Sequence, residues 1–325
     1  MKYKIIICAA ALAGSLGVVK AEEVIRFAHM NGPSHFVHTE AAAMAERVRE
    51  RTDGQVRIDL FPSGQLGESA QLVEQMAFGA DLMGQVQAGN LADYVPDFSI
   101  IVYPFMYGGI EDVERLIGSD LVTQLNEQVL QNNLRVMCYL HYGTRDLYTR
   151  NREARSPAET ADMAIRVQPV TIYTQMVERV MGGSPTPIPW PEVYSALAQG
   201  VIDAAEAPPL SIIDQRHYEH ARFLIQTNHI QDIVPLVISA SQFDRLSPEH
   251  QDILQTEADA ACAAMSAASI ASYETGISKL RDNGMTIISD VDRAAFAERA
   301  GTIAESFPEW TPGLYERARA IIDSK

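Results

Sequence analysis

Apolar and polar positions alternate with two different periodicities along this chain of 325 residues, one typical of strands and one typical of helices. Short apolar or alternating runs, typical of strands, occupy residues 24–28, 56–61, 82–86, 135–140, 147–149 and 164–167. Between and after them, apolar residues recur at helical spacing over residues 39–51, 68–78, 110–132, 171–181 and 193–199. Strands that alternate with helices in this order predict α/β domains with largely parallel sheets.

The segment that begins at Ser247 predicts one unusually long helix. Ser247 is a good N-cap and Pro248 fits the first turn, and no helix breaker follows until Asn283-Gly284. A helix of about 36 residues is roughly 54 Å long, which exceeds a single small domain. Its apolar face is rich in alanine and lacks a sustained leucine heptad, so a coiled coil fits less well than a helix lying across two domains.

The chain therefore predicts two α/β lobes that form a clamshell, with the long helix spanning both. No low-complexity linker separates the lobes, so we expect several chain crossings between them. The expected boundaries give residues 22–142 and 233–272 to lobe I, and residues 143–232 and 273–325 to lobe II.

The first 21 residues have the pattern of a secretory signal peptide. Lys2 and Lys4 precede an apolar run over residues 5–16, and Val19-Lys20-Ala21 resembles a cleavage site. The apolar run is shorter than the roughly 20 residues that a membrane anchor needs. We therefore expect export, with a mature chain that begins at Glu22.

The charge balance is strongly acidic, with 26 Lys and Arg against 42 Asp and Glu and a net charge of −16. Residues 1–21 hold three lysines and no acid, so the mature chain would carry −19. This balance argues against nucleic acid and anionic membranes as partners. After residue 21 only Lys279 and Lys325 are lysines, and arginine, whose fork fits a carboxylate, supplies the other positive charges.

Two cysteines, Cys138 and Cys262, remain after the signal peptide. Export permits a disulfide. However, Cys138 lies in an apolar strand-like run and Cys262 in an alanine-rich helix, so the pattern favours two separately buried thiols over a bridge.

The motifs of common enzyme classes are missing from the sequence. It contains no GxGxxG, Walker loop, GxSxG elbow or HExxH. His217 and His220 share a helix face at the spacing of metal ligands, but no third ligand is predicted nearby. We therefore expect neither a metal nor a cofactor, and an enzyme is the weaker hypothesis.

Four prolines at alternate positions, Pro185, Pro187, Pro189 and Pro191, require an extended and stiff segment, with Trp190 between the last two. This segment carries a family resemblance. The segments that carry it occur in the order typical of one protein family: "FPSGQLGES" (61–69), "YGTRDLYT" (142–149), "IRVQP" (165–169), "GGSPTPIPWPEVYSALAQGVIDAAEAPP" (182–209), "TNHI" (227–230) and "LSPEHQ" (246–251). Together they resemble the DctP-like solute-binding proteins of tripartite ATP-independent periplasmic (TRAP) transporters, over essentially the whole mature chain.

The resemblance implies a periplasmic-binding-protein-like clamshell that closes over a small organic acid and delivers it to a TRAP permease. It implies that Arg166, in the R-V strand, clamps the ligand carboxylate, with Arg145 of the G-T-R segment as a second contact. It also implies that Trp190 packs against the ligand. Gln87, Glu206 and His35 complete the expected ligand-binding set, and His229 helps to shape the polar site.

Several alternatives stay open at this point. Arg166 could be a surface arginine at a strand end, and Trp190 could belong to the core near the hinge. Asn90 replaces an arginine seen in relatives that bind sialic acid, which argues against that ligand. The sequence thus predicts a periplasmic, monomeric receptor for a monocarboxylate or sugar acid, with an exported α/β enzyme on the same scaffold as the alternative.

Overall fold

The computed structural model describes residues 22–324, and the expected signal peptide lies outside this range. Within it, nine strands form one mixed sheet in the order β2-β1-β3-β8-β4-β7-β5-β6, with β9 paired to β8. The strands are β1 (Glu23–Ala28), β2 (Val56–Phe61), β3 (Leu82–Gln85), β4 (Leu134–Thr149), β5 (Ala164–Val167), β6 (Ser184–Pro187), β7 (Ala204–Ala207), β8 (Phe223–Ser239) and β9 (Thr286–Ile288).

The helices cover both faces of this sheet. The α-helices are α1 (Phe36–Arg51), α2 (Ser69–Ala77), α3 (Ala88–Leu91), α4 (Ile110–Ile117), α5 (Asp120–Leu130), α6 (Pro157–Thr160), α7 (Thr171–Gln175), α8 (Val193–Gln199), α9 (Pro209–Asp214), α10 (Ala240–Arg245), α11 (Pro248–Asp282), α12 (Arg293–Ala300) and α13 (Leu314–Asp323). Shorter turns are η1 (Pro96–Val102), η2 (Met176–Met181, a π-helix), η3 (Trp190–Glu192), η4 (His217–Glu219) and η5 (Ile303–Ser306). None of the helices in residues 22–324 combines the length and hydrophobicity that crossing a bilayer requires.

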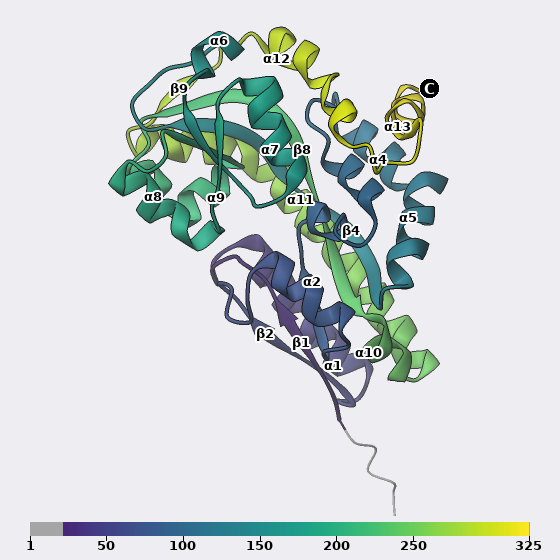
Figure 1. The fold of residues 1–325 in the computed structure, drawn as a ribbon. Coiled ribbons are helices and arrows are strands. Elements are labelled where there is room, and N and C mark those ends of the chain that lie inside the picture. Colours follow the sequence, from purple (N-terminus) through teal and green to yellow (C-terminus); the bar gives the residue numbers. More distant parts are fainter. Residues whose placement is uncertain (1–21, 325) are drawn as a thin grey trace, which may run out of the picture.

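Two long strands, β4 and β8, connect the two lobes. They pair antiparallel along most of their length, and Figure 1 shows them running from the lobe with β1, β2, α1 and α2 to the lobe with α7, α8 and α9. The outer strands of each lobe pair parallel, as the sequence predicts, in β2-β1-β3 and in β7-β5-β6. The fold is therefore two-lobed, but its two halves share one sheet through an antiparallel ribbon that the sequence did not indicate.

The long helix is confirmed and spans both lobes. Helix α11 begins after Ser247, whose hydroxyl accepts a hydrogen bond from the His250 N–H at 3.2 Å, and ends before Asn283-Gly284. Its first half contributes buried residues such as Leu254 to the core of lobe I. Its second half contributes Leu280 to the core behind lobe II.

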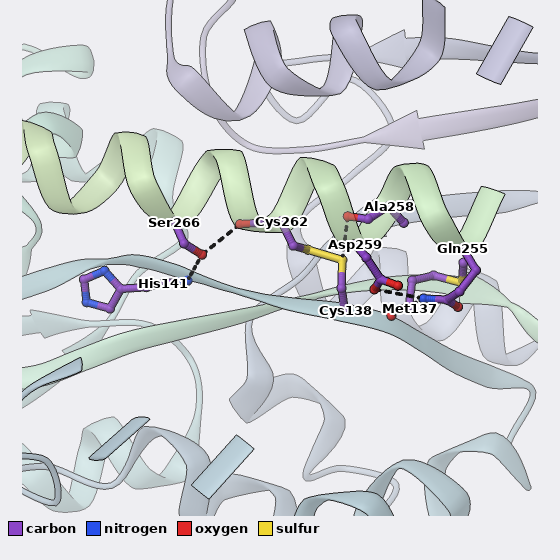
Figure 2. The surroundings of a disulfide bond; sticks show 8 residues. All are labelled: Met137, Cys138, His141, Gln255, Ala258, Asp259, Cys262 and Ser266. Atoms are coloured by element: carbon purple, nitrogen blue, oxygen red, sulfur yellow. Dashed lines mark hydrogen bonds between the residues drawn. A yellow bond between two sulfur atoms is a disulfide. The ribbon is translucent and has the colours of Figure 1, made fainter. Parts of the chain in front are cut away.

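The preference for two free thiols is wrong, because Cys138 and Cys262 form a disulfide. Figure 2 shows it joining β4 to α11. A hydrogen bond lies on either side of it: Gln255 donates to the Met137 carbonyl at 2.8 Å, and the His141 N–H donates to Ser266 at 3.0 Å. The two sulfur atoms can be shielded from solvent and still bond to each other, because the alanine-rich face of α11 lies close to β4.

Two further local expectations also differ from the structure. The helix expected over residues 110–132 breaks at Gly118-Ser119, where Ser119 caps the N-terminus of α5 with its side chain. The strands expected at 135–140 and 147–149 are one strand, β4, whose pairing with β8 shifts register three times. Each bulge interrupts the strict alternation of apolar and polar residues, so the sequence pattern does not reveal one continuous strand.

Candidate ligand-binding site

A cavity of about 280 Å³ lies between the lobes, just below the range of roughly 300–1,000 Å³ that is typical of ligand pockets. It lies beyond the carboxyl ends of β3, β5 and β7, where ligands bind in open α/β sheets. The polar residues that line it from the N-terminal lobe are Asn31, Glu68, Ser69, Gln71, Gln85, Gln87 and Asn90. Tyr142 lines it at the boundary between the lobes, and Arg145, Arg166, Gln168, Trp190 and Ser211 line it from the other lobe.

Arg166 lies near the end of β5 and is 1% exposed. Its Nε donates to the Ile188 carbonyl at 2.8 Å, but its buried Nη1 has no hydrogen-bond partner. No carboxylate in residues 22–324 lies within 4.0 Å of it. Burial lowers the pKa of Arg166 to about 10, against the opposing effect of Glu206, so the side chain is charged at neutral pH. It is a buried cation with a free donor at the wall of a cavity.

Arg145, from β4, is equally buried but its donors are occupied. Its Nε and Nη2 contact the carboxylate of Glu206, the latter at 2.8 Å, and Nη2 also donates to the Glu206 carbonyl at 3.0 Å. Its Nη1 donates to Asp232 at 2.6 Å. Four of its five N–H groups are therefore engaged, although the residue lines the cavity.

The carboxylates around Arg145 differ in their titration. Burial alone would raise the pKa of Glu206, but the charge of Arg145 and the hydrogen bond from His229 lower it to about 2. Burial raises the pKa of Asp232, and Arg145 only partly offsets this. Glu206 is thus ionised at neutral pH, and its negative charge neutralises the positive charge of Arg145.

Trp190 begins η3, between the last two prolines of the proline segment. Pro185 and Pro187 fall in β6, an edge strand, where a residue without an N–H is tolerated. The Trp190 ring packs edge-on against His217, with 4.8 Å between ring centroids, and lies 5.2 Å from the guanidinium carbon of Arg166. The stiff segment therefore holds an indole against the free arginine.

The six residues expected at the site are not all brought together. Arg166, Arg145, Trp190 and Gln87 line the cavity, as does Asn90. Glu206 lies behind Arg145, fully buried, with His229 3.4 Å from its carboxylate. His35 does not line the cavity either: it caps α1 by accepting from the Val37 N–H at 3.3 Å, and its ring stacks on Tyr142.

Several cavity residues were not singled out in the sequence. Glu68 lies in the quoted "FPSGQLGES" motif, so a signal existed for it, but no chemistry pointed to it. Tyr142 likewise begins the quoted "YGTRDLYT" motif. Asn31 and Ser211 had no such signal, because their roles depend on a chain of contacts: the Tyr142 hydroxyl donates to Asn31 at 2.6 Å and lies 3.0 Å from the Ser211 hydroxyl.

This chain of contacts crosses the cleft. Asn31 belongs to the loop after β1, whereas Ser211 belongs to α9 in the other lobe. Beside it, the Gly32 N–H donates to the Asp214 carboxylate at 3.3 Å. The structure therefore has the two lobes in contact around the cavity.

The metal candidate from the sequence has no support in the described range. His217 is fully buried beneath Trp190, with its Nδ1 2.7 Å from the Tyr148 hydroxyl. No group of three or more His, Cys, Asp or Glu residues within 22–324 could hold a metal ion.

Comparison with known proteins gives one consistent result. Residues 27–309 match the family model of DctP, described as bacterial extracellular solute-binding protein, family 7. The chain is 26% identical over 304 residues to the 2,3-diketo-L-gulonate-binding periplasmic protein of Escherichia coli K12, covering 93% of this chain and 92% of the relative.

Two similar crystal structures are TRAP periplasmic solute-binding proteins. One, from Actinobacillus succinogenes, has bound L-galactonate, 29% identity and a TM-score of 0.88, over 92% of this chain and 99% of that one. Another, from Fusobacterium, has bound sn-glycerol-3-phosphate, 29% identity and a TM-score of 0.88, over 92% and 97%. The family consists of solute-binding receptors rather than enzymes. This chain belongs to the DctP family of bacterial extracellular solute-binding proteins and is a periplasmic receptor of the TRAP type.

Proposed function

We propose that this receptor binds a sugar acid, whose carboxylate is held by Arg166, and delivers it to the membrane subunits of a TRAP permease. The observation that carries the proposal is the unpartnered Nη1 of Arg166 at the cavity wall. A buried guanidinium without an anion costs several kcal/mol of desolvation, and a bound carboxylate offsets that cost. Two hydrogen bonds from the fork would also fix the ligand's orientation.

The rest of the cavity suits hydroxyl groups. Amide and hydroxyl side chains dominate its polar lining, and the buried Oε1 of Gln87 lacks a donor. L-galactonate and 2,3-diketo-L-gulonate, the ligands named for two similar proteins, combine a carboxylate with several oxygens. Trp190 would form the apolar wall beside the carboxylate, and the last N–H of Arg145 would supply a second, weaker contact.

We infer that the lobes hinge at the expected boundaries. The boundary between residues 142 and 143 coincides with a register shift, because His141 pairs with Ile233 whereas Gly143 pairs with Asp232. Gly143 has a φ of +151° and packs against Pro208, which a larger residue could not do. Ligand binding would then hold a closed state through contacts to both lobes.

The proposal contains no catalytic step. Glu206 and Asp232, both fully buried, are committed to Arg145 and do not line the cavity. The receptor would act as a monomer and release its ligand unchanged. Mass spectrometry of the released ligand checks this, and a modified product would favour the enzyme alternative.

Arg166→Lys tests the proposal directly. The substitution keeps the charge but removes the fork, so calorimetry with L-galactonate, 2,3-diketo-L-gulonate and sn-glycerol-3-phosphate should show affinity lowered by at least about tenfold for the acid that binds. Arg216→Lys, at an exposed arginine of the same lobe, is the matched control and should bind normally. Unchanged affinity in Arg166→Lys would remove this residue from the site.

A further inference from the structure

The cavity is asymmetric in charge. Arg166 lines it from the end of β5, and Glu68 lines it from the opposite lobe, at the N-cap position of α2. The backbone N–H of Glu68 donates to the Gln71 side chain at 2.9 Å, which fixes this turn. A ligand between the lobes therefore meets a cation on one side and a carboxylate on the other.

Glu68 is not neutralised by a protein partner. No Lys, Arg or His in residues 22–324 lies within 4.0 Å of its carboxylate. Partial burial raises the pKa of Glu68, Arg166 lowers it, and the neighbouring Glu192 raises it. The Glu68 side chain also accepts from the Gln71 backbone N–H in the capping box of α2, and the residue lines the cavity with its carboxylate partly removed from water.

A second acceptor lies on the same side of the cavity. The Oε1 of Gln87 is buried without a donor, while the Gln87 N–H donates to Ser69 at 2.8 Å. The N-terminal lobe thus presents two acceptors, and the opposite lobe presents the free donor of Arg166. Such a pair of surfaces fits a ligand with one acidic end and one end that donates hydrogen bonds.

We propose that Glu68 determines specificity by charge: it accepts a hydrogen bond from a hydroxyl group remote from the ligand's carboxylate, and it excludes ligands with a second acidic group at that end. This inference rests on the proposed function, because it takes the first carboxylate to be held at Arg166. Two like charges in a closed cavity repel strongly, whereas a hydroxyl donates to a carboxylate.

A matched pair of probes isolates this effect. Galactonate and galactarate have the same carbon chain and differ at one end, where a CH₂OH group replaces a carboxylate; gluconate and glucarate form a second such pair. By calorimetry at pH 7.5, the wild-type chain should prefer the monoacid of the pair it binds by about 50-fold or more. Glu68→Gln keeps the shape and removes the charge, so the preference should narrow to about fivefold or less.

Glu192→Gln is the control, because Glu192 acts on Glu68 only through its charge and does not line the cavity. This variant should keep most of the preference for the monoacid. Thermal melting confirms that both variants are folded.

The proposal is overturned if the wild-type chain binds the diacid as tightly as the monoacid, or if Glu68→Gln retains the full preference. Binding of neither acid overturns it as well. A failure of Arg166→Lys to weaken monoacid binding would instead contradict the proposed function, so the two failures are distinguishable.

Discussion

Two buried arginines line the same cavity, and their surroundings are opposite. Arg145 is enclosed by Glu206 and Asp232, both fully buried, so its charge is neutralised within the protein. Arg166 is as buried, yet it has one backbone acceptor, an indole ring and a free Nη1. Equal burial and equal charge therefore do not indicate equal function.

The difference separates structure from recognition. A buried ion pair that satisfies its hydrogen bonds is sensitive to the loss of either partner, because the other is left charged and unpaired. A buried charge without a partner reduces stability until a ligand supplies one. We therefore expect Arg145 to govern folding and Arg166 to govern binding.

Arg145→Met should have the largest effect on stability. It leaves Glu206 and Asp232 buried without their cation, which typically costs about 3–5 kcal/mol in the free energy of unfolding. Urea denaturation followed by circular dichroism measures the loss. Stability within about 1 kcal/mol of wild type would show that the carboxylates do not depend on Arg145, and the comparison would fail.

Arg166→Met should produce the reverse pattern. Removal of a desolvated, unpaired charge should leave the free energy of unfolding unchanged or raise it by about 1 kcal/mol, because the Arg145–Glu206 pair persists. Affinity for the acid should fall about 100-fold or more, since hydrogen bonds to a charged group are lost. Denaturation and calorimetry on the same preparation check both halves. A strongly destabilised variant would make Arg166 structural.

Trp190→Ala sharpens the account of the wall beside Arg166. Loss of the indole should weaken binding by about tenfold to a hundredfold, because an aromatic buried against a ligand contributes about 1–3 kcal/mol. Tryptophan fluorescence can report binding in a Trp310→Phe background. That background needs its own stability check, because the Trp310 indole donates to Pro96 and Ser99 at 3.1 and 3.0 Å. Normal affinity with earlier melting would assign Trp190 to the core.

Moderate acid should affect folding without affecting the arginines. Burial lowers the pKa of His29 and His217 to about 3 and that of His35 to about 4, so the unfolded chain binds more protons than the folded chain below pH 6.5. These histidines should lower the unfolding free energy from pH 6.5 towards pH 4, by up to about 1.4 kcal/mol per pH unit each. Asp146, whose pKa burial raises to about 7, acts in the opposite direction and should offset about one of the three, so the net free energy should still fall. Affinity at Arg166, which stays charged, should be constant from pH 6 to 8.

Urea denaturation at pH 7, 6 and 5 measures this slope. His35→Asn removes one titrating group and keeps a residue that can cap α1. The slope of its unfolding free energy against pH should therefore be smaller than that of the wild type by the contribution of one histidine. A stability that does not change between pH 7 and pH 5 would contradict the prediction.

Local patterns predicted the elements whose character is set within a few residues. The capped start of α11 and the extended proline segment are examples, since Ser247-Pro248 and the alternating prolines restrict the backbone directly. Strand β8 was missed, because its central residues Thr227 to Asp232 are mostly polar. Most of them are buried through contacts with distant parts of the chain, such as the hydrogen bond that Arg145 donates to Asp232.

The site was predictable to the extent that it lies within motifs. Arg166 and Trp190 were identified by segments that carry a family resemblance, and both line the cavity. The sequence could not show that the donors of Arg145 are occupied by Glu206 and Asp232, because these partners lie 61 and 87 residues away along the chain. The disulfide was hidden for the same reason, since 124 residues separate its cysteines.

A crystal structure with the bound acid tests the central claim most directly. The account predicts that the ligand carboxylate lies about 2.7–2.9 Å from the Nη1 of Arg166, with Arg145 still paired to Glu206 and Asp232. A carboxylate bound instead to Arg145, with Nη1 of Arg166 still unpartnered, would contradict it.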